Sequence, residues 1–165
     1  VNTNNSSGWN VILYGNNQGS DSASTTMYYR ADSCTSTRDY NTQITDQTEW
    51  VPGSATTTGG NAVQIGSLAN TQNVLAFRVM SASSTNGAAF WSTGWWGTVD
   101  DYADNAATKW AGIASSTVYR QIGNSSVSSG GGSALNTVLY YLDAPVGQQG
   151  GCYEAPLTFT ATVNP

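Results

Sequence analysis

Apolar and polar residues alternate with a period of two along most of the chain. A segment with one apolar face and one Thr-rich face is typical of a half-buried strand in an antiparallel sheet. Residues 157–163 show this most clearly, because their apolar residues alternate with Thr158, Thr160 and Thr162. Residues 135–142 are apolar on both faces and predict a central strand. The strands predicted in this way are residues 9–14, 75–79, 117–122, 135–142 and 157–163.

Clusters of Gly, Asn and Ser separate these segments, as in residues 15–21, 128–133 and 147–151. Gly and Asn tolerate positive φ, so such clusters mark the places where a chain reverses direction. Short strands between turns predict an all-β fold, an antiparallel β-sandwich that is Ig-like or jelly-roll-like, with long Gly/Ser/Asn-rich loops. At most one short helix is expected, at residues 102–114, which a loop explains equally well. Since no linker or repeat interrupts residues 1–165, we expect a single domain.

The composition points to a location outside the cell. Charged residues make up 9% of the chain, against about 25% in ordinary soluble domains, and 41 Ser and Thr with 15 Asn take their place. Uncharged polar surfaces of this kind are common in secreted and cell-surface proteins. Val1 opens without an initiator Met or a signal peptide, so we expect a processed or trimmed mature form.

Cys34 and Cys152 are the only cysteines. An even count in a chain of secreted character predicts a disulfide between them. Closing so long a loop would stabilise the fold by about 4–5 kcal/mol in the chain-entropy picture. Two unpaired buried thiols are the alternative.

Charge argues against two classes of partner. The net charge is −5, and the five basic residues lie singly along the chain rather than in a patch. They cannot neutralise a row of phosphates or an anionic membrane surface, so we expect no nucleic-acid partner. No apolar run of about 18 residues exists, so we expect no membrane insertion in this segment.

The chain contains no histidine. This removes the commonest general base, the usual Ser and Cys triads and the commonest metal ligand. Ten carboxylates remain, and a glycosidase needs two of them roughly 5–10 Å apart. Most of them adjoin Gly, Ser or Asn in predicted turns, so we expect no enzyme and assign no catalytic residue. A hydrolase with paired carboxylates is the weakest of three functional hypotheses.

Two further segments are candidate binding sites. Asp100, Asp101 and Asp104 form the densest oxygen cluster, which could bind calcium, although a solvated acidic turn is the simpler interpretation. No other cofactor is expected. The aromatic segment at residues 90–97 carries adjacent Trp residues, which point to opposite faces if they lie on a strand. These aromatic side chains could pack in the core, anchor a subunit contact or stack on a sugar, and the candidates are Trp91, Trp95 and Trp96.

Three sites match the N-glycosylation sequon: Asn4, Asn5 and Asn124. Such matches arise easily in a chain rich in Asn and Ser.

The two ends of the chain carry a resemblance. Residues 1–11, VNTNNSSGWNV, look like the opening of many secreted prokaryotic cell-surface β-sandwich domains. Residues 151–163, with Gly-Cys-Tyr leading into LTFTATV, are similar to the closing strand of those domains and of many pilins. The similarity covers about 30 residues and specifies sheet ends rather than an activity. It implies a role in surface layers, pili or filaments, often by lending a terminal strand to a neighbour.

Both terminal segments are β-like and uncharged, with no ionic side chain in residues 1–18 or 155–165. An exposed sheet edge without charges is a template for another strand. We therefore expect self-association, as a structural subunit of an extracellular filament, pilus (fimbria) or surface layer. The alternative is a carbohydrate-binding or adhesive module that uses the Trp-rich segment and a glycan ligand. The predicted assembly strands carry Trp9, Val11, Leu13, Leu157, Phe159 and Val163.

Overall fold

The computed structural model describes nine β-strands and no helix within residues 1–15, 26–31, 34–39, 44–46, 74–79, 88–89, 110–113, 120–130 and 136–165. This part of the chain is therefore all-β, and it contains no helix that is long and apolar enough to cross a membrane. The strands are β1 (Trp9–Gly15), β2 (Tyr28–Arg30), β3 (Thr45–Asp46), β4 (Val74–Val79), β5 (Ala88–Ala89), β6 (Arg120–Ser125), β7 (Val138–Leu142), β8 (Cys152–Glu154) and β9 (Leu157–Val163).

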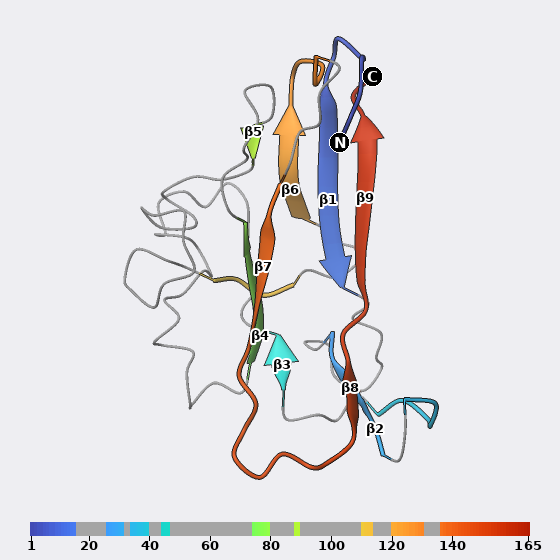
Figure 1. Ribbon diagram of the computed structural model, residues 1–165, viewed down its shortest axis with the longest axis vertical. Helices are drawn as coiled ribbons and strands as arrows, with labels where there is room; N and C mark the ends of the chain where they lie inside the picture. The colour runs from blue at the N-terminus through green and yellow to red at the C-terminus, as the bar shows by residue number, and fades with distance from the viewer. Residues whose placement is uncertain are drawn as a thin grey trace.

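The largest sheet has the order β5-β6-β1-β9, and all its pairs are antiparallel (Figure 1). Strand β1 is central, with β6 on one side and β9 on the other. Its side chains alternate between buried and half-buried, as the period of two predicts. The N-terminal strand and the C-terminal strand are thus neighbours in one sheet.

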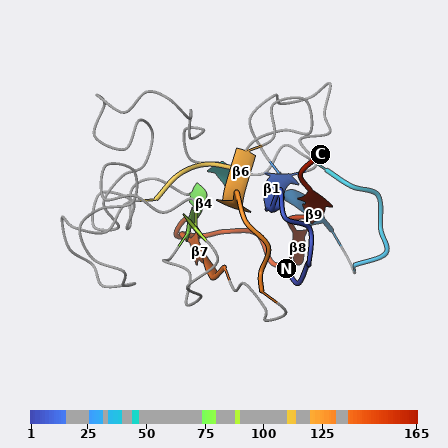
Figure 2. The same cartoon turned by 90° about the horizontal axis from the view of Figure 1, so that it is seen from above.

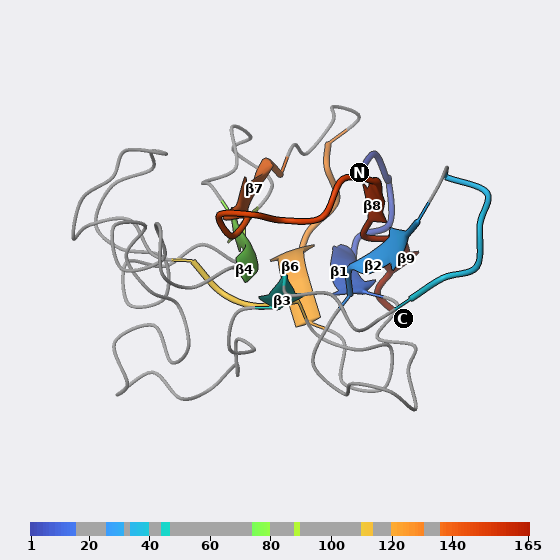
Figure 3. The same cartoon turned by 90° about the horizontal axis from the view of Figure 1, so that it is seen from below.

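A second sheet has the order β3-β4-β7, in which β3 runs parallel and β7 antiparallel to β4. The third sheet is the short antiparallel pair β2-β8. Viewed from above and from below, β6, β1 and β9 follow one another across the larger sheet, and β4 and β7 lie on the β6 side of it (Figures 2 and 3).

One hydrophobic cluster joins the two larger sheets. Each large side chain that is fully buried there contributes about 1.5–3 kcal/mol. A smaller cluster of Ala76 and Trp110 lies on the other face of β4, so β4 is covered on both faces. The buried members of the main cluster are Trp9, Val11, Leu13, Met27, Ile44, Leu75, Phe77, Val79, Ala111, Ile113 and Ile122.

The structure bears on two expectations about secondary structure. Residues 110–113, at the end of the candidate helix, are not helical: the backbones of Phe77 and Ala111 exchange hydrogen bonds of 2.8 and 2.9 Å. Residues 102–109 and 114 lie outside the described residues. Residues 135–142 are predicted to form a central strand, whereas among the described strands β7 lies at the edge of its sheet and pairs with β4. Its two apolar faces have separate causes, because Val138 packs on the main cluster whereas Leu139 and Tyr141 pack on the smaller one.

Hydrogen bonds that involve side chains hold both ends of the chain against the four-stranded sheet. The amide of Thr3 donates to Ser129 Oγ at 2.8 Å, and this hydroxyl donates back to the Thr3 carbonyl oxygen at 2.9 Å. Asn5 Nδ2 donates to the carbonyl oxygen of Asn164 at 2.9 Å. Asn164 Nδ2 in turn donates to the carbonyl oxygen of Ser125 at 3.0 Å. Residues 1–8 are thereby held against the β6 and β9 ends of the sheet.

Candidate assembly surface

Strand β9 forms one edge of the four-stranded sheet (Figure 1). Its seven residues pair with β1 from end to end, from Val163 opposite Trp9 to Leu157 opposite Gly15. None of the described strands pairs with its other side. Since residues 155–165 carry no charge, nothing ionic on this segment opposes the approach of a second strand.

The register shows which backbone groups of β9 face outward. The amide of Asn164 donates to the carbonyl oxygen of Gly8 at 3.0 Å, so this residue bonds toward β1. In an antiparallel pair, residues that bond to the partner alternate with residues whose N–H and C=O point away. Counting back from Asn164 in steps of two, the residues whose backbone groups bond to β1 are Thr162, Thr160 and Thr158. The outward N–H and C=O groups therefore belong to Leu157, Phe159, Ala161 and Val163.

The apolar side chains of β9 lie on the core side of the sheet but are only partly covered. Phe159 and Val163 are opposite Leu13 and Trp9, which are 1% and 0% exposed. Phe159 is nevertheless 51% exposed and Val163 56%. The prediction that this face of β9 is buried is wrong for these two residues, because β9 is at the edge of the sheet and, among the described strands, has a neighbour on one side.

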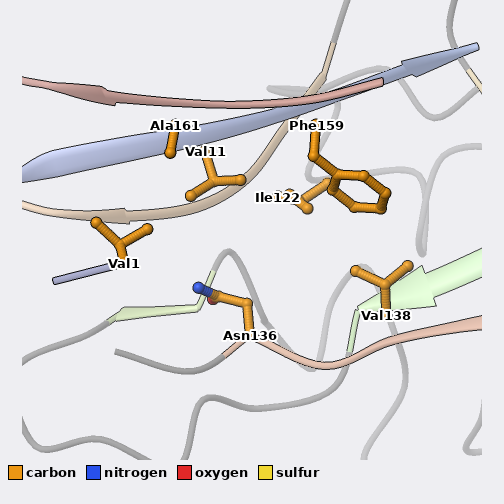
Figure 4. Close-up of a pocket in the computed structure, with 7 residues that line it drawn as sticks. All are labelled: Val1, Val11, Ile122, Asn136, Val138, Phe159 and Ala161. Atoms are coloured by element: carbon orange, nitrogen blue, oxygen red, sulfur yellow. The ribbon is translucent and has the colours of Figure 1, made fainter. Parts of the chain in front are cut away.

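An apolar pocket of about 250 Å³ opens beside this exposed row (Figure 4). Phe159 points into it from β9, and Val138 faces it from β7. The pocket thus lies between the two larger sheets, on the side where the long strands β7 and β9 form the sheet edges. Its other lining residues are Val1, Val11, Ile122, Asn136 and Ala161.

Asn136 is the polar side chain in this lining. It packs closely on β6, since a Cβ added to Gly123 would lie 2.6 Å from Asn136 Oδ1. That oxygen is buried and has no hydrogen-bond partner among the described residues. An unsatisfied buried acceptor costs about 1–3 kcal/mol, so a donor that entered the pocket would find a favourable partner here.

Strand β7 is a second long edge strand among the described strands, also without charged residues. Its Tyr140 is 43% exposed and its Leu142 is 53% exposed. Desolvation raises the pKa of Tyr140 to about 12, so the hydroxyl stays neutral across the physiological range. The other described edge strands are shorter: β3 and β5 have two residues each, and β2 and β8 have three each. Among the described edges, β7 and β9 are therefore the ones long enough to accept a partner strand.

The predicted disulfide is confirmed: Cys34 and Cys152 are bonded, with their Cα atoms 5.3 Å apart and 118 positions between them. Because Cys152 begins β8, the bridge ties the loop after β2 to the strand that immediately precedes β9. Among the described residues, the one group with metal-ligand spacing is this pair with Glu154. Both sulfurs are consumed by the disulfide, so neither is available as a thiolate ligand.

A polar cluster beside the disulfide holds β2 to β8. The Tyr28 hydroxyl donates to the Glu154 carboxylate, which also lies 3.6 Å from Arg30 Nε. The guanidinium groups of Arg30 and Arg38 lie 5.2 and 4.9 Å from the centre of the Tyr28 ring. The hydrogen bond with Tyr28, and then the charge of Glu154, raise the pKa of Arg30. These contacts engage Glu154 in a structural role.

The three sequons differ in accessibility. Asn4 is exposed, whereas Asn5 and Asn124 are half-buried. Asn5 Nδ2, the atom that would carry a glycan, donates to Asn164, and Asn5 Oδ1 accepts from the Ser7 amide at 2.8 Å. A glycan on Asn5 would break the bond that ties residues 1–8 to the end of β9, so Asn4 is the better placed acceptor of the two.

The candidates for sugar and calcium binding lie outside the described residues. They are Trp91, Trp95 and Trp96 for the sugar or a subunit contact, and Asp100, Asp101 and Asp104 for calcium.

The expected assembly strands divide into two groups. Trp9, Val11 and Leu13 lie on β1, whose two sides are both paired within the chain and whose core-facing side chains are buried. Their part in assembly stays a prediction, and a strand with two neighbours offers no free backbone groups for it. Phe159 and Val163 lie on the open β9 edge and are exposed, and Leu157 on the same strand is half-buried.

No protein-family model matches this chain, and no curated protein or solved structure shows detectable similarity to it.

Proposed function

We propose that this chain is a structural subunit of an extracellular filament, pilus or surface layer that assembles through β-strand edges. The observation that carries the proposal is β9, a seven-residue edge strand with no charge and with Phe159 and Val163 exposed. Natural monomers usually protect such edges with Lys, Pro, a bulge or a covering loop. An edge on which the described residues place none of these devices is suited to receive another strand.

The second free edge supports an assembly that propagates. A subunit with one contact surface forms closed pairs, whereas one with two can extend into a chain. Strand β7 supplies that second edge, in the other large sheet. We further propose that the two larger sheets are the layers of a β-sandwich, because they share one hydrophobic cluster.

The proposed extracellular location is supported by the disulfide and by the composition. Disulfides persist in oxidising compartments and are rare in reducing cytosol. The low content of charged residues, 9%, is in keeping with a surface solvated by hydroxyl and amide groups.

Light scattering over a concentration series, with electron microscopy of the most concentrated sample, tests the proposal. We expect species larger than the 17.3 kDa chain that grow with concentration. Val163→Lys places a charge on the β9 edge, and Val146→Lys is its matched control at a fully exposed position between β7 and β8. We expect Val163→Lys to abolish or strongly reduce association and Val146→Lys to leave it unchanged. A wild-type chain that stays monomeric at the highest concentration refutes the proposal.

A further inference from the structure

We propose that the β9 edge is occupied by β9 of a second copy of this chain, in antiparallel register about a two-fold axis at Thr160. This inference rests on the proposed function and identifies the contact that the proposed assembly uses. It follows from the register of β9, the side chains on each face and the absence of charge.

The sequence of β9 is self-complementary. Its seven residues, LTFTATV, have Thr160 at the centre. In antiparallel register about this residue, Leu157 lies opposite the partner's Val163, and Phe159 lies opposite the partner's Ala161. Thr158 lies opposite the partner's Thr162. Apolar residues therefore meet apolar residues and Thr meets Thr at every position, whereas a slip of one residue would set Thr against apolar side chains.

The outward backbone N–H and C=O groups of β9 fit the same register. The outward N–H and C=O groups belong to Leu157, Phe159, Ala161 and Val163, as the bond from Asn164 to Gly8 establishes. Two-fold pairing about Thr160 sets these residues opposite one another, so that donors meet acceptors in hydrogen-bonded pairs. Thr160 then faces the partner's Thr160 in a non-hydrogen-bonded pair, with Cα atoms about 4.5 Å apart.

The exposed side chains also fit. Phe159 is large and the partner's Ala161 is small, so the ring has room beside the opposing strand. Its diagonal neighbours would be the partner's Phe159 and the partner's Val163, within reach of an aromatic side chain. The residues that are 51% and 56% exposed in one copy, Phe159 and Val163, would thereby cover one another across the axis.

Charge favours a second copy over a charged partner strand. Residues 155–165 offer no ionic group to attract an acidic or basic segment, whereas an identical strand brings an equally neutral surface. Pairing would join two four-stranded sheets into one continuous sheet and would leave the β7 edge free for a different contact.

Oxidative cross-linking of variants that each add one cysteine, with the Cys34–Cys152 disulfide left intact, tests the register. Thr160→Cys should form a disulfide-linked dimer, because about 4.5 Å between Cα atoms is within disulfide range. Thr158→Cys alone should not, since its counterpart on the partner lies four residues away, about 13 Å along the strand. An equimolar mixture of Thr158→Cys and Thr162→Cys should link, and it tests the same register if Thr160→Cys does not fold. Non-reducing electrophoresis and peptide mapping by mass spectrometry identify the linked positions.

The outcomes separate this inference from the proposed function. A link at position 160 together with a heterodimeric link between positions 158 and 162 supports it. Association of the wild type without either link overturns the β9 pairing and leaves assembly through another edge, such as β7. A link from Thr158→Cys alone also overturns it, because that requires a different register. The absence of any association in the wild type overturns both proposals.

Discussion

Strands β1 and β9 have the same length and lie side by side, and the core-facing side of each carries apolar residues at every second position. Their burial differs sharply: Trp9 and Leu13 on β1 are 0% and 1% exposed, whereas their direct partners Val163 and Phe159 on β9 are 56% and 51% exposed. Among the strands that the structure describes, β1 has a neighbour on each side and β9 has one on a single side. Alternation thus determines which face a residue occupies, and the position of the strand in the sheet determines whether that face is covered.

The difference identifies the strand suited to association. Apolar residues on β1 have their stabilising partners within the chain. The apolar side chains of β9 are only partly covered, and they lie beside an apolar pocket. The N–H and C=O groups of the same residues point away from β1. We therefore expect β1 to dominate the stability of the single chain and β9 to dominate its association.

The largest effect should come from truncating opposing residues of the two strands. We expect Leu13→Ala to lower the free energy of unfolding by about 2–5 kcal/mol, as for a buried leucine. Phe159→Ala should lower it by about 1 kcal/mol, because roughly half of this side chain is already in water. Urea unfolding of dilute protein measures both. If the two variants lose equal free energy of unfolding, Phe159 is as well covered in the single chain as Leu13, and the contrast between β1 and β9 does not hold.

A smaller difference in stability is expected between two glycine substitutions, one at Gly8 just before β1 and one at Gly147 in the exposed turn before β8. Gly8 has φ +88°, and a Cβ there would lie 2.0 Å from the carbonyl oxygen of Ser125. Gly147 has φ +83°, with nothing within 4 Å of its added Cβ. We expect Gly8→Ala to cost about 3 kcal/mol, from strain plus the clash, and Gly147→Ala about 1 kcal/mol, from strain alone. Thermal and urea unfolding of the pair check this, and similar costs would contradict the close packing around the start of β1.

The smallest effect concerns the second free edge. The pKa of Tyr140 on β7 is raised to about 12 from an ordinary value of about 10. The unfolded chain therefore loses this proton at a lower pH than the folded chain does. The contribution of Tyr140 to stability is complete below pH 10 and falls as the pH rises toward 12. We expect Tyr140→Phe to reduce the loss of stability between pH 10 and 12 slightly, measured by urea unfolding at each pH. An unchanged pH profile would show that this hydroxyl is not desolvated.

Much of the fold could be predicted from local patterns. The alternation in residues 9–14, 75–79 and 157–163 corresponds to β1, β4 and β9, and the even cysteine count led to the disulfide. These features depend on residues near one another in sequence or on a residue type with few roles.

The arrangement of strands could not be predicted in this way. Strand β1 pairs with strands more than 100 positions away, and nothing in residues 9–14 specifies that β6 and β9 flank it. For the same reason the pattern of β7 suggested a central strand. The pocket between Phe159 and Val138, and the contact of Tyr28 with Glu154, also form only when distant segments meet.

Backbone amide exchange along β9 at two protein concentrations tests the central claim most directly. We predict that the amides of Thr158, Thr160 and Thr162 are protected in both samples, because they bond to β1. The amides of Phe159, Ala161 and Val163 should exchange rapidly in the dilute sample and become protected in the concentrated one, as a second strand pairs with them. Rapid exchange of these three amides at both concentrations, in a sample that light scattering shows to be associated, would contradict the claim that β9 is the joining edge.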